Sequence, residues 1–188
     1  MRLVELESKR TPTRVKGEIV LGVVSDTHLP RFGRALPRAL VRGLRNAGVQ
    51  AVVHCGDLTE RFALDLFSDI APVFAVAGNN DGASLHRSLG ERLIISYAGL
   101  SIGIVHGHAG PGRTTPDRAF NAFTGRSVDA VLFGHSHIPY RGRRDGVLLF
   151  NPGSPTDKRM NPAFSYGVLR VTDDGIRASH RWYLARTP

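Results

Sequence analysis

Short runs of valine, isoleucine and other apolar residues recur along the chain, and they constrain its fold more than any other feature. Each run is five to seven residues long and is bounded by glycine, asparagine or aspartate, which is typical of buried β-strands. We therefore expect five strands, each ending in a polar loop. The five runs span residues 18–24, 49–54, 72–77, 100–106 and 129–133.

The segments between the first three runs have the features of helices. Residues 35–48 carry Pro37 near their start and Gly48 past their end, which are favourable positions for these residue types. Residues 59–69 begin at Thr59, a residue type that caps helix N-termini. This strand–helix–strand alternation predicts a parallel βαβ half.

The second half of the chain has a different pattern, in which strands are joined by tight turns. Residues 91–106 predict a hairpin that turns at Ala98-Gly99, and residues 141–146 predict a second hairpin tip with Asp145-Gly146 in its turn. We therefore expect an α/β fold of two packed sheets, the first largely parallel, with helices outside. Further strands are expected at 146–151, 165–171 and 176–184.

Length and composition are those of an ordinary globular protein. The 188 residues fit a single domain at 18–188, preceded by a polar, solvated leader at 1–17. The chain has no apolar run long enough to cross a bilayer, and the leader lacks the apolar core of a secretory signal, so we expect no membrane partner. The single cysteine, Cys55, is compatible with a reducing compartment, and we expect a cytoplasmic location.

Each of the five predicted strands is followed within a few residues by aspartate, histidine or asparagine. Ligands bind at the carboxyl ends of strands in open α/β sheets, so we expect these clusters to meet along one edge. The Asp-x-His spacing also suits an extended chain, in which residues two apart lie on the same side. The clustered donors are Asp26, His28, Asp57, Asn79, His106, His135 and His137.

Each cluster alone has an ordinary structural explanation. Asp57 precedes a predicted helix and suits a cap, and Asn79 suits a loop. A lone His106 at a strand end is more often a hydrogen-bonded core residue than a ligand. Five such clusters at successive strand ends are hard to obtain by chance, and we therefore favour a shared site.

The donor set indicates a pair of metal ions. Seven nitrogen and oxygen donors are too many for one tetrahedral zinc ion, but they suit two metals that share a carboxylate. Mixed imidazole and carboxylate ligands favour manganese, iron, zinc or nickel over calcium, and we expect two divalent ions, with manganese first among them. Two dications balanced by Asp26 and Asp57 retain enough positive charge for a hydroxide and a phosphate oxygen, as in two-metal phosphoryl hydrolysis.

The order of these motifs resembles a known family. Asp-x-His, Gly-Asp, Gly-Asn, His-Gly-His and Gly-His-x-His follow one another as in the calcineurin-like metallophosphoesterases, and residues 150–155 (FNPGSP) resemble the small prokaryotic phosphodiesterase branch. The resemblance covers residues 18–183. It implies a four-layer α/β/β/α sandwich of two mixed sheets. It also implies a phosphodiesterase that hydrolyses small, aryl or nucleotide phosphodiesters by attack of a metal-bridged hydroxide, and it leaves a homo-oligomer open.

The resemblance further implies how the donors are divided between the two metals. One metal would be held by Asp26, His28 and His137. The other would be held by Asn79, His106 and His135, with Asp57 as the bridge.

Asn80 is the main departure from the family pattern. Many relatives have a histidine at this position that is thought to protonate the leaving group, and an asparagine cannot act as a general acid near neutral pH. We therefore expect a preference for good leaving groups, or help from another donor such as His108. Asn80 and His108 are the candidate catalytic residues.

Two other functions compete with hydrolysis of small esters. A sorting-coat subunit uses the same fold as a scaffold, but a scaffold tolerates missing ligands and this chain keeps all seven. The net charge of +9 prompts a nuclease or nucleic-acid binder. That partner is not favoured, because aromatic residues make up only 7 % of the chain and no basic stretch is interleaved with them.

Overall fold

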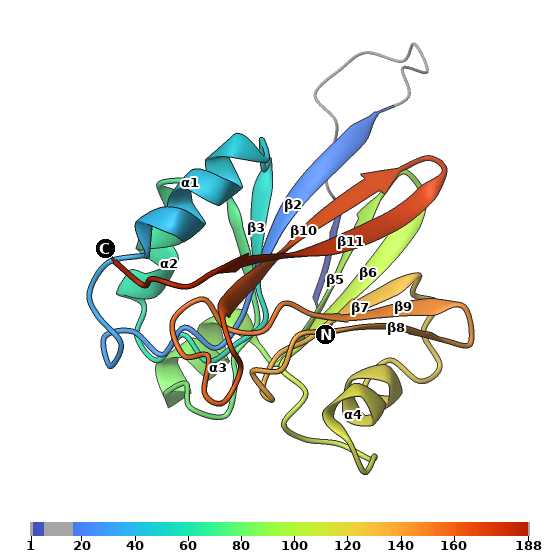
Figure 1. Ribbon diagram of the computed structural model, residues 1–188. Coiled ribbons are helices and arrows are strands. Elements are labelled where there is room, and N and C mark those ends of the chain that lie inside the picture. The colour runs from blue at the N-terminus through green and yellow to red at the C-terminus, as the bar shows by residue number, and fades with distance from the viewer. Residues whose placement is uncertain (1, 6–16, 188) are drawn as a thin grey trace.

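Two β-sheets pack face to face in the computed structural model, which describes residues 2–5 and 17–187 (Figure 1). The five-stranded sheet has the order β11-β10-β2-β3-β4, and the six-stranded sheet has the order β1-β5-β6-β7-β9-β8. The strands of the first sheet are β2 (Glu18–Val24), β3 (Ala51–His54), β4 (Val73–Ala75), β10 (Phe164–Thr172) and β11 (Gly175–Tyr183). Those of the second are β1 (Arg2–Glu5), β5 (Arg92–Tyr97), β6 (Leu100–Val105), β7 (Ala130–Leu132), β8 (Tyr140–Arg144) and β9 (Val147–Asn151).

Helices cover both outer faces, so the four-layer α/β/β/α sandwich is confirmed. Three helices lie beyond the five-stranded sheet and one beyond the six-stranded sheet (Figure 1). The first three are α1 (Arg38–Asn46), α2 (Phe62–Ser68) and α3 (Ala83–Leu89), and the fourth is α4 (Thr115–Asn121).

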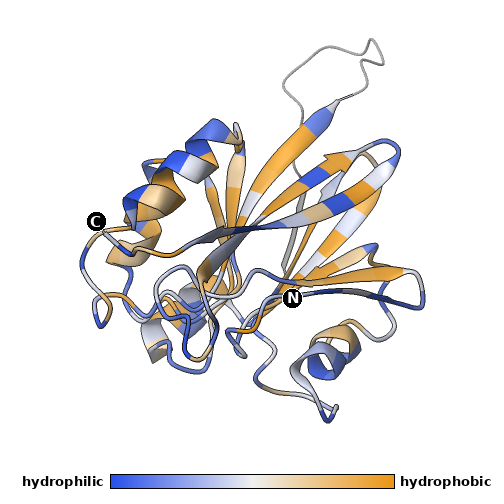
Figure 2. Cartoon of the chain, in the orientation of Figure 1, coloured by the Kyte–Doolittle hydropathy of each residue, from blue (hydrophilic) through white to orange (hydrophobic). Residues whose placement is uncertain are grey.

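The alternation of side chains along β2 explains why both of its faces need a partner. Leu21 and Val23 point into the core between the sheets, whereas Val20 and Val24 pack with the helices on the other side. A strand that is apolar on both faces is stable only when both are covered. Figure 2 shows the resulting pattern, with apolar strands inside and hydrophilic residues on the outer turns of α1.

The pairing of the strands agrees with the sequence pattern. β2, β3 and β4 are parallel, as the βαβ alternation predicts, and β10 and β11 extend the same sheet in the antiparallel sense. The two predicted hairpins are also confirmed. Ala98-Gly99 and Asp145-Gly146 have φ of 51°, 78°, 49° and 83°, and tight two-residue hairpins require such positive angles.

The structure adds one strand within the predicted leader and overturns one predicted helix cap. Residues 2–5 lie within the predicted solvated leader, but they form β1, which pairs in parallel with β5; residues 6–16 lie outside the described residues. Thr59 does not cap a helix, because α2 begins at Phe62. Thr59 has φ of 82°, and its N–H donates to the carboxylate of Asp81 at 2.6 Å, so a long-range contact replaces the cap.

None of the helices in the described parts of the chain combines the length and the apolar character that a membrane crossing requires.

His54 is fully buried where β3 ends, and its neutral form satisfies both ring nitrogens. The N–H of Gly56 donates to Nδ1 at 3.2 Å, and Nε2 lies 3.0 Å from the hydroxyl of Thr27, to which it donates. Burial lowers the pKa of His54 to about 3, and the neighbouring His106 acts in the same direction. His54 therefore stays neutral in the folded protein at any mildly acidic pH.

The stability of the fold should decrease on mild acidification because of His54. The unfolded chain binds a proton on His54 below its ordinary pKa of 6.5, whereas the folded chain does not until about pH 3. Between about pH 7 and pH 5 this difference removes about 2 kcal/mol of stability. Urea unfolding of the native chain and of His54→Gln, which cannot titrate, measures it. The difference in the free energy of unfolding between the native chain and His54→Gln should be about 2 kcal/mol smaller at pH 5 than at pH 7. An unchanged difference would contradict the conclusion that His54 is neutral in the folded protein.

Candidate metal centre

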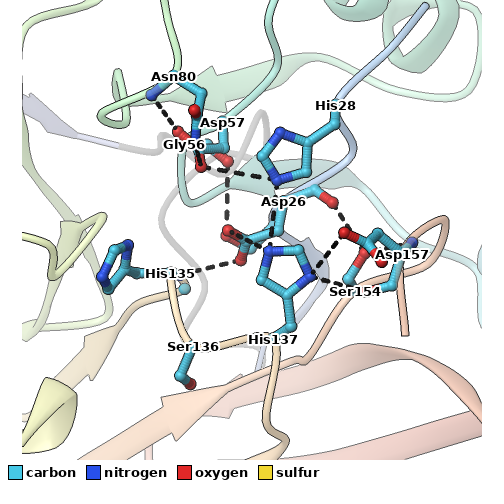
Figure 3. Close-up of polar contacts among 12 residues, drawn as sticks. Asp26, His28, Gly56, Asp57, Asn80, His135, Ser136, His137, Ser154 and Asp157 are labelled. Carbon is cyan, nitrogen blue, oxygen red and sulfur yellow. Dashed lines mark hydrogen bonds and ion pairs between the residues drawn. The ribbon is translucent and has the colours of Figure 1, made fainter. Parts of the chain in front are cut away.

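The loops that follow β2, β3, β4, β6 and β7 meet at one edge of the sandwich and bring the predicted donors together. Figure 3 labels Asp26, His28, Asp57, His135 and His137 among them. Two groups of side chains have ligand atoms within 4.8 Å of one another. Both groups contain Asp26. The first is Asp26, His28 and His137, and the second is Asp26, Asp57 and His106.

Asp26 lies at the middle of the centre and is completely buried. Its Oδ2 accepts the N–H of His135 at 3.0 Å, but its Oδ1 has no hydrogen-bond partner among the described residues. Oδ1 lies 3.5 Å from Nε2 of His137 and 3.9 Å from Nε2 of His106. A buried carboxylate oxygen without a donor is costly unless a cation compensates it.

The histidines of the first group turn their Nε2 atoms toward each other. Nδ1 of His137 donates to the carbonyl of Asp157 at 2.7 Å, which leaves a lone pair on its Nε2. That lone pair faces Nε2 of His28 at 3.3 Å. Burial lowers the pKa of His28 below its usual value, despite the opposing charges of Asp57 and Asp26. Two imidazoles whose Nε2 atoms converge beside a buried carboxylate are typical metal ligands.

His106 has the same arrangement in the second group. Its Nδ1 donates to the carbonyl of Cys55 at 2.8 Å, and its Nε2 lies 3.3 Å from Oδ2 of Asp57 and 3.1 Å from Oδ1 of Asn79. A lone pair that faces two oxygens requires a proton or a metal ion between them. Burial alone would lower the pKa of His106, but Asp57 and Asp26 outweigh it and raise the pKa, which shows how strongly this position attracts positive charge.

Asn79 and His135 complete the second group. Oδ1 of Asn79 lies 3.0 Å from Nδ1 of His135, so this oxygen sits between the rings of His135 and His106. Oδ2 of Asp57 lies 3.6 Å from Nε2 of His28, and it thereby reaches one histidine of each group. All seven predicted donors are thus gathered, and the donor set fits a pair of divalent cations.

The loops reach these positions through left-handed backbone, which the sequence did not predict. Asp26, His28, His135 and His137 have φ of 56°, 47°, 68° and 60°. The expectation that each pair lies on an extended chain was therefore wrong, because each pair lies in a tight turn after its strand. Left-handed backbone costs about 1 kcal/mol or more for residues other than glycine, so other contacts must hold these turns.

The FNPGSP segment and Thr156, which follows it, supply some of those contacts. The hydroxyl of Ser154 donates to the carbonyl of Asp26 at 2.8 Å, and that of Thr156 donates to the carbonyl of Thr27 at 2.7 Å. Both hydroxyls are buried. A segment more than a hundred residues away in the sequence therefore fixes the turn that carries Asp26 and His28.

Asp81 is a supporting residue that the sequence analysis missed. Its buried carboxylate accepts the N–H groups of Asp57 at 3.0 Å, Gly78 at 2.8 Å and Thr59 at 2.6 Å. It therefore ties the loop after β3 to the loop after β4. The nearby Gly78 has no room for a side chain, because a Cβ there would overlap the carboxylate of Asp57. Asp81 is the last residue of the sequence GNND at positions 78–81. No local sequence pattern indicates that its carboxylate accepts hydrogen bonds from two different loops.

The two candidate catalytic residues lie beside the ligand groups. The backbone N–H and the amide of Asn80 donate to the two carboxylate oxygens of Asp57 at 2.8 and 2.7 Å. Burial would raise the pKa of Asp57, but hydrogen bonds from His106 and Asn80 hold it well below the usual range. Asn80 therefore orients Asp57 in this structure.

His108 is half-buried and lies next to the second group. Its ring centroid is 5.4 Å from that of His106 and 6.2 Å from that of His135. It lines a pocket of about 160 Å³ together with Glu91 and Arg92. Burial, reinforced by the charge of His106, lowers the pKa of His108, which keeps it neutral near pH 7.

Comparisons with known proteins agree with this centre. A family model described as the calcineurin-like phosphoesterase superfamily domain matches residues 19–174, which include every candidate ligand. The chain is 37 % identical to a probable metallophosphoesterase of Methanocaldococcus jannaschii over 159 residues, covering 84 % of this chain and 78 % of that protein. It is 29 % identical to a phosphodiesterase of the same organism, over 71 % of this chain and 82 % of that protein.

Solved structures share the fold over nearly their whole length. A structure described as a novel archaeal phosphodiesterase aligns with a TM-score of 0.67 and 25 % identity. The alignment covers 88 % of this chain and 100 % of that one. Vps29 of Entamoeba histolytica, in complex with zinc, aligns with a TM-score of 0.68 and 23 % identity, over 87 % of this chain and 99 % of that one. The likeness to Vps29 concerns the fold alone. The match of sequence, fold and ligand geometry leads to one conclusion: the chain belongs to the calcineurin-like phosphoesterase superfamily.

Proposed function

We propose that the chain is a phosphodiesterase that works with two divalent metal ions at the centre described above. The observation that carries the proposal is the convergence of the ring nitrogens of His28, His106 and His137 on the buried carboxylates of Asp26 and Asp57, an arrangement that a bound cation would satisfy. The names of the similar proteins, which include a phosphodiesterase, support the same class of reaction.

The residues divide into two sites that share their carboxylates. Asp26, His28 and His137 would hold one ion, and Asn79, His106 and His135 would hold the other. Asp57 would bridge them, because its Oδ2 reaches both His28 and His106. When bound, such a pair of ions activates a water molecule as the nucleophile and neutralises charge on the phosphoryl oxygens.

Neighbouring groups keep the ligands in the protonation state that metal binding requires. The carbonyls of Cys55 and Asp157 accept from Nδ1 of His106 and His137, which leaves both Nε2 atoms free for metal. Hydrogen bonds from Asn80 keep Asp57 ionised and fixed in orientation. These ligands are therefore already oriented for metal binding.

Neither Cys55 nor Ser136 is suited to form a covalent intermediate. Cys55 is completely buried, and burial raises the pKa of its thiol, an effect that the charge of Asp26 increases. The hydroxyl of Ser136 is engaged by the amide of Asn151 at 3.1 Å and the N–H of Ile138 at 3.3 Å. These contacts favour direct attack of water on phosphorus.

The proton supply favours substrates with good leaving groups. The amide of Asn80 cannot donate a proton in catalysis and is held by Asp57. His108 is neutral near pH 7, because burial lowers its pKa. Without a general acid, an aryl or similarly stable leaving group departs most easily. Manganese remains our first choice of metal, because the donors are imidazoles, carboxylates and an amide oxygen.

Metal replacement should identify the activity. The chain is stripped with a chelator and restored with one divalent ion at a time, and hydrolysis of bis(4-nitrophenyl) phosphate and 4-nitrophenyl phosphate is compared. We expect turnover only with metal, fastest with manganese and faster on the diester.

Asp57→Asn should lower kcat/KM about a hundredfold or more. The control is Asp69→Asn, an exposed carboxylate at the end of α2, which should be unchanged.

No turnover with any divalent ion would refute the enzyme assignment, and faster cleavage of the monoester would make the chain a phosphatase.

Restoring a histidine after Asn79 should change the leaving-group preference. Asn80→His introduces a group that can protonate the leaving oxygen, and we expect the rate on alkyl diesters, relative to aryl diesters, to rise about tenfold or more. Asn80→Ala removes only the amide contact with Asp57, so it separates loss of orientation from gain of an acid. An unchanged alkyl-to-aryl ratio in Asn80→His would count against the missing-acid explanation.

A further inference from the structure

Large hydrophobic side chains are exposed on segments close to the metal centre. Among the described residues five are exposed, and their exposed fractions range from 38 % to 98 %. They are Ile138, Tyr140, Met160, Trp182 and Leu184. Exposed apolar side chains that gather beside a site mark a contact surface, whereas single scattered ones need no explanation.

Ile138 and Met160 lie directly next to a ligand of the metal centre. Ile138 follows His137 in the chain. Met160 is adjacent to Asn161, whose amide donates to the carbonyl of His137 at 3.0 Å. Met160 is almost fully solvent-exposed at 98 %, and Ile138 is 58 % exposed.

Trp182 on β11 is connected to the same centre through one strand pairing and two hydrogen bonds. It pairs with Ser165 of β10, and the N–H of Ser165 donates to the carbonyl of Ser154 at 3.0 Å. Ser154 in turn holds the carbonyl of Asp26. The indole is 53 % exposed, and its ring lies 5.5 Å from the ring of His180.

Arginines accompany these side chains on the edge strands of the two sheets. The guanidinium of Arg141 on β8 donates to the carbonyl of Ala178 on β11 at 3.0 Å, so the two edge strands lie side by side. Arg143 also contacts only a backbone carbonyl, that of Gly146. Neither strand contains an acidic residue, and within residues 2–5 and 17–187 neither arginine has a carboxylate partner. We refer to Ile138, Arg141, Arg143, Met160 and Trp182 as the edge surface.

We propose that the edge surface binds a single-stranded nucleic acid, and that nucleic-acid strands are the substrate class of the adjoining centre. The second part rests on the proposed phosphodiesterase activity. Single strands are bound by aromatic faces that stack on bases together with cations that contact phosphates, and Trp182 with Arg141 and Arg143 supplies both.

Two alternative occupants fit the surface less well. A second copy of the chain would bring the same unpaired arginines against each other, and the chain already carries a net charge of +9. A bilayer also presents phosphodiesters, but proteins that lie on bilayers typically use an amphipathic helix or a cluster of basic residues, whereas these exposed side chains lie on strands and loops. A nucleic-acid strand contains phosphodiester bonds along its length, so it can occupy the edge surface and the metal centre at the same time.

Trp182 is the single tryptophan of the chain, so its fluorescence reports base stacking directly. Metal-loaded, full-length protein is titrated with oligothymidylate of about eight nucleotides. We expect quenching of the tryptophan and an affinity that falls with salt. An abasic oligomer of the same length retains the phosphates alone, and it should bind more weakly without quenching. Repeating the titration after chelation keeps the binding result independent of hydrolysis.

Variants separate the stacking contact from the charged contacts, with binding followed by anisotropy of a labelled oligomer. Trp182→Ala should weaken binding about fivefold or more, whereas Trp182→Phe should retain most of it. Arg143→Gln should reduce the magnitude of the salt slope by about 0.7, and Arg45→Gln, an exposed arginine on α1, should not. In steady state, Trp182→Ala should raise KM for the oligonucleotide and leave KM for bis(4-nitrophenyl) phosphate unchanged.

Equal affinity for the abasic oligomer, or an unchanged affinity in Trp182→Ala, would overturn the proposal. A blue shift of the tryptophan with vesicles of phosphatidylcholine and phosphatidylserine, without binding of the oligomer, would assign the surface to a membrane instead. Concentration-dependent dimerisation that is lost in Trp182→Ala would assign it to a second copy. Binding of the oligomer without hydrolysis of any ester would refute the proposed function and leave the binding surface intact.

Discussion

The structure depends on two buried carboxylates that need a cation. Asp26 and Asp57 are almost completely removed from water, and the nearest ring nitrogens, those of His28, His106 and His137, lie 3.3 to 3.6 Å from their oxygens. Buried charge of one sign is stable only when it is compensated nearby. Hydrogen bonds from Asn80 to Asp57 compensate part of it, and the remaining demand is what makes this edge a metal centre.

The same centre explains where the fold carries strain. Five ligand residues occupy left-handed backbone, and they are held by contacts from distant parts of the chain. Ser154 and Thr156 fix the turn after β2, and Asp81 ties the loops after β3 and β4. The strained turns point their side chains inward, and the rigid sandwich supplies the anchoring groups. Stability in the layers thus compensates for the cost of preorganising the site.

The centre and the edge surface together suggest one extended binding region. The centre offers converging metal ligands with little provision for protonating a leaving group, and the edge surface offers an indole and unpaired guanidinium groups. The centre suits a phosphodiester bond, and the edge surface suits the nucleic-acid strand on either side of that bond. The positive net charge then assists the approach of such a substrate.

The sequence by itself determined the layers and the ligand types. Runs such as residues 18–24 and 129–133 encode strands because hydrophobic periodicity is local. The metal-ligand donors can be predicted as well, because they follow these runs directly in the sequence. The tertiary structure alone decided the rest. It placed residues 2–5 in a sheet, replaced the Thr59 cap with a contact to Asp81, and put Asp26 and His28 in a tight turn. It also joined Arg141 to the strand of Trp182. These features depend on contacts between residues far apart in the chain, which no local pattern encodes.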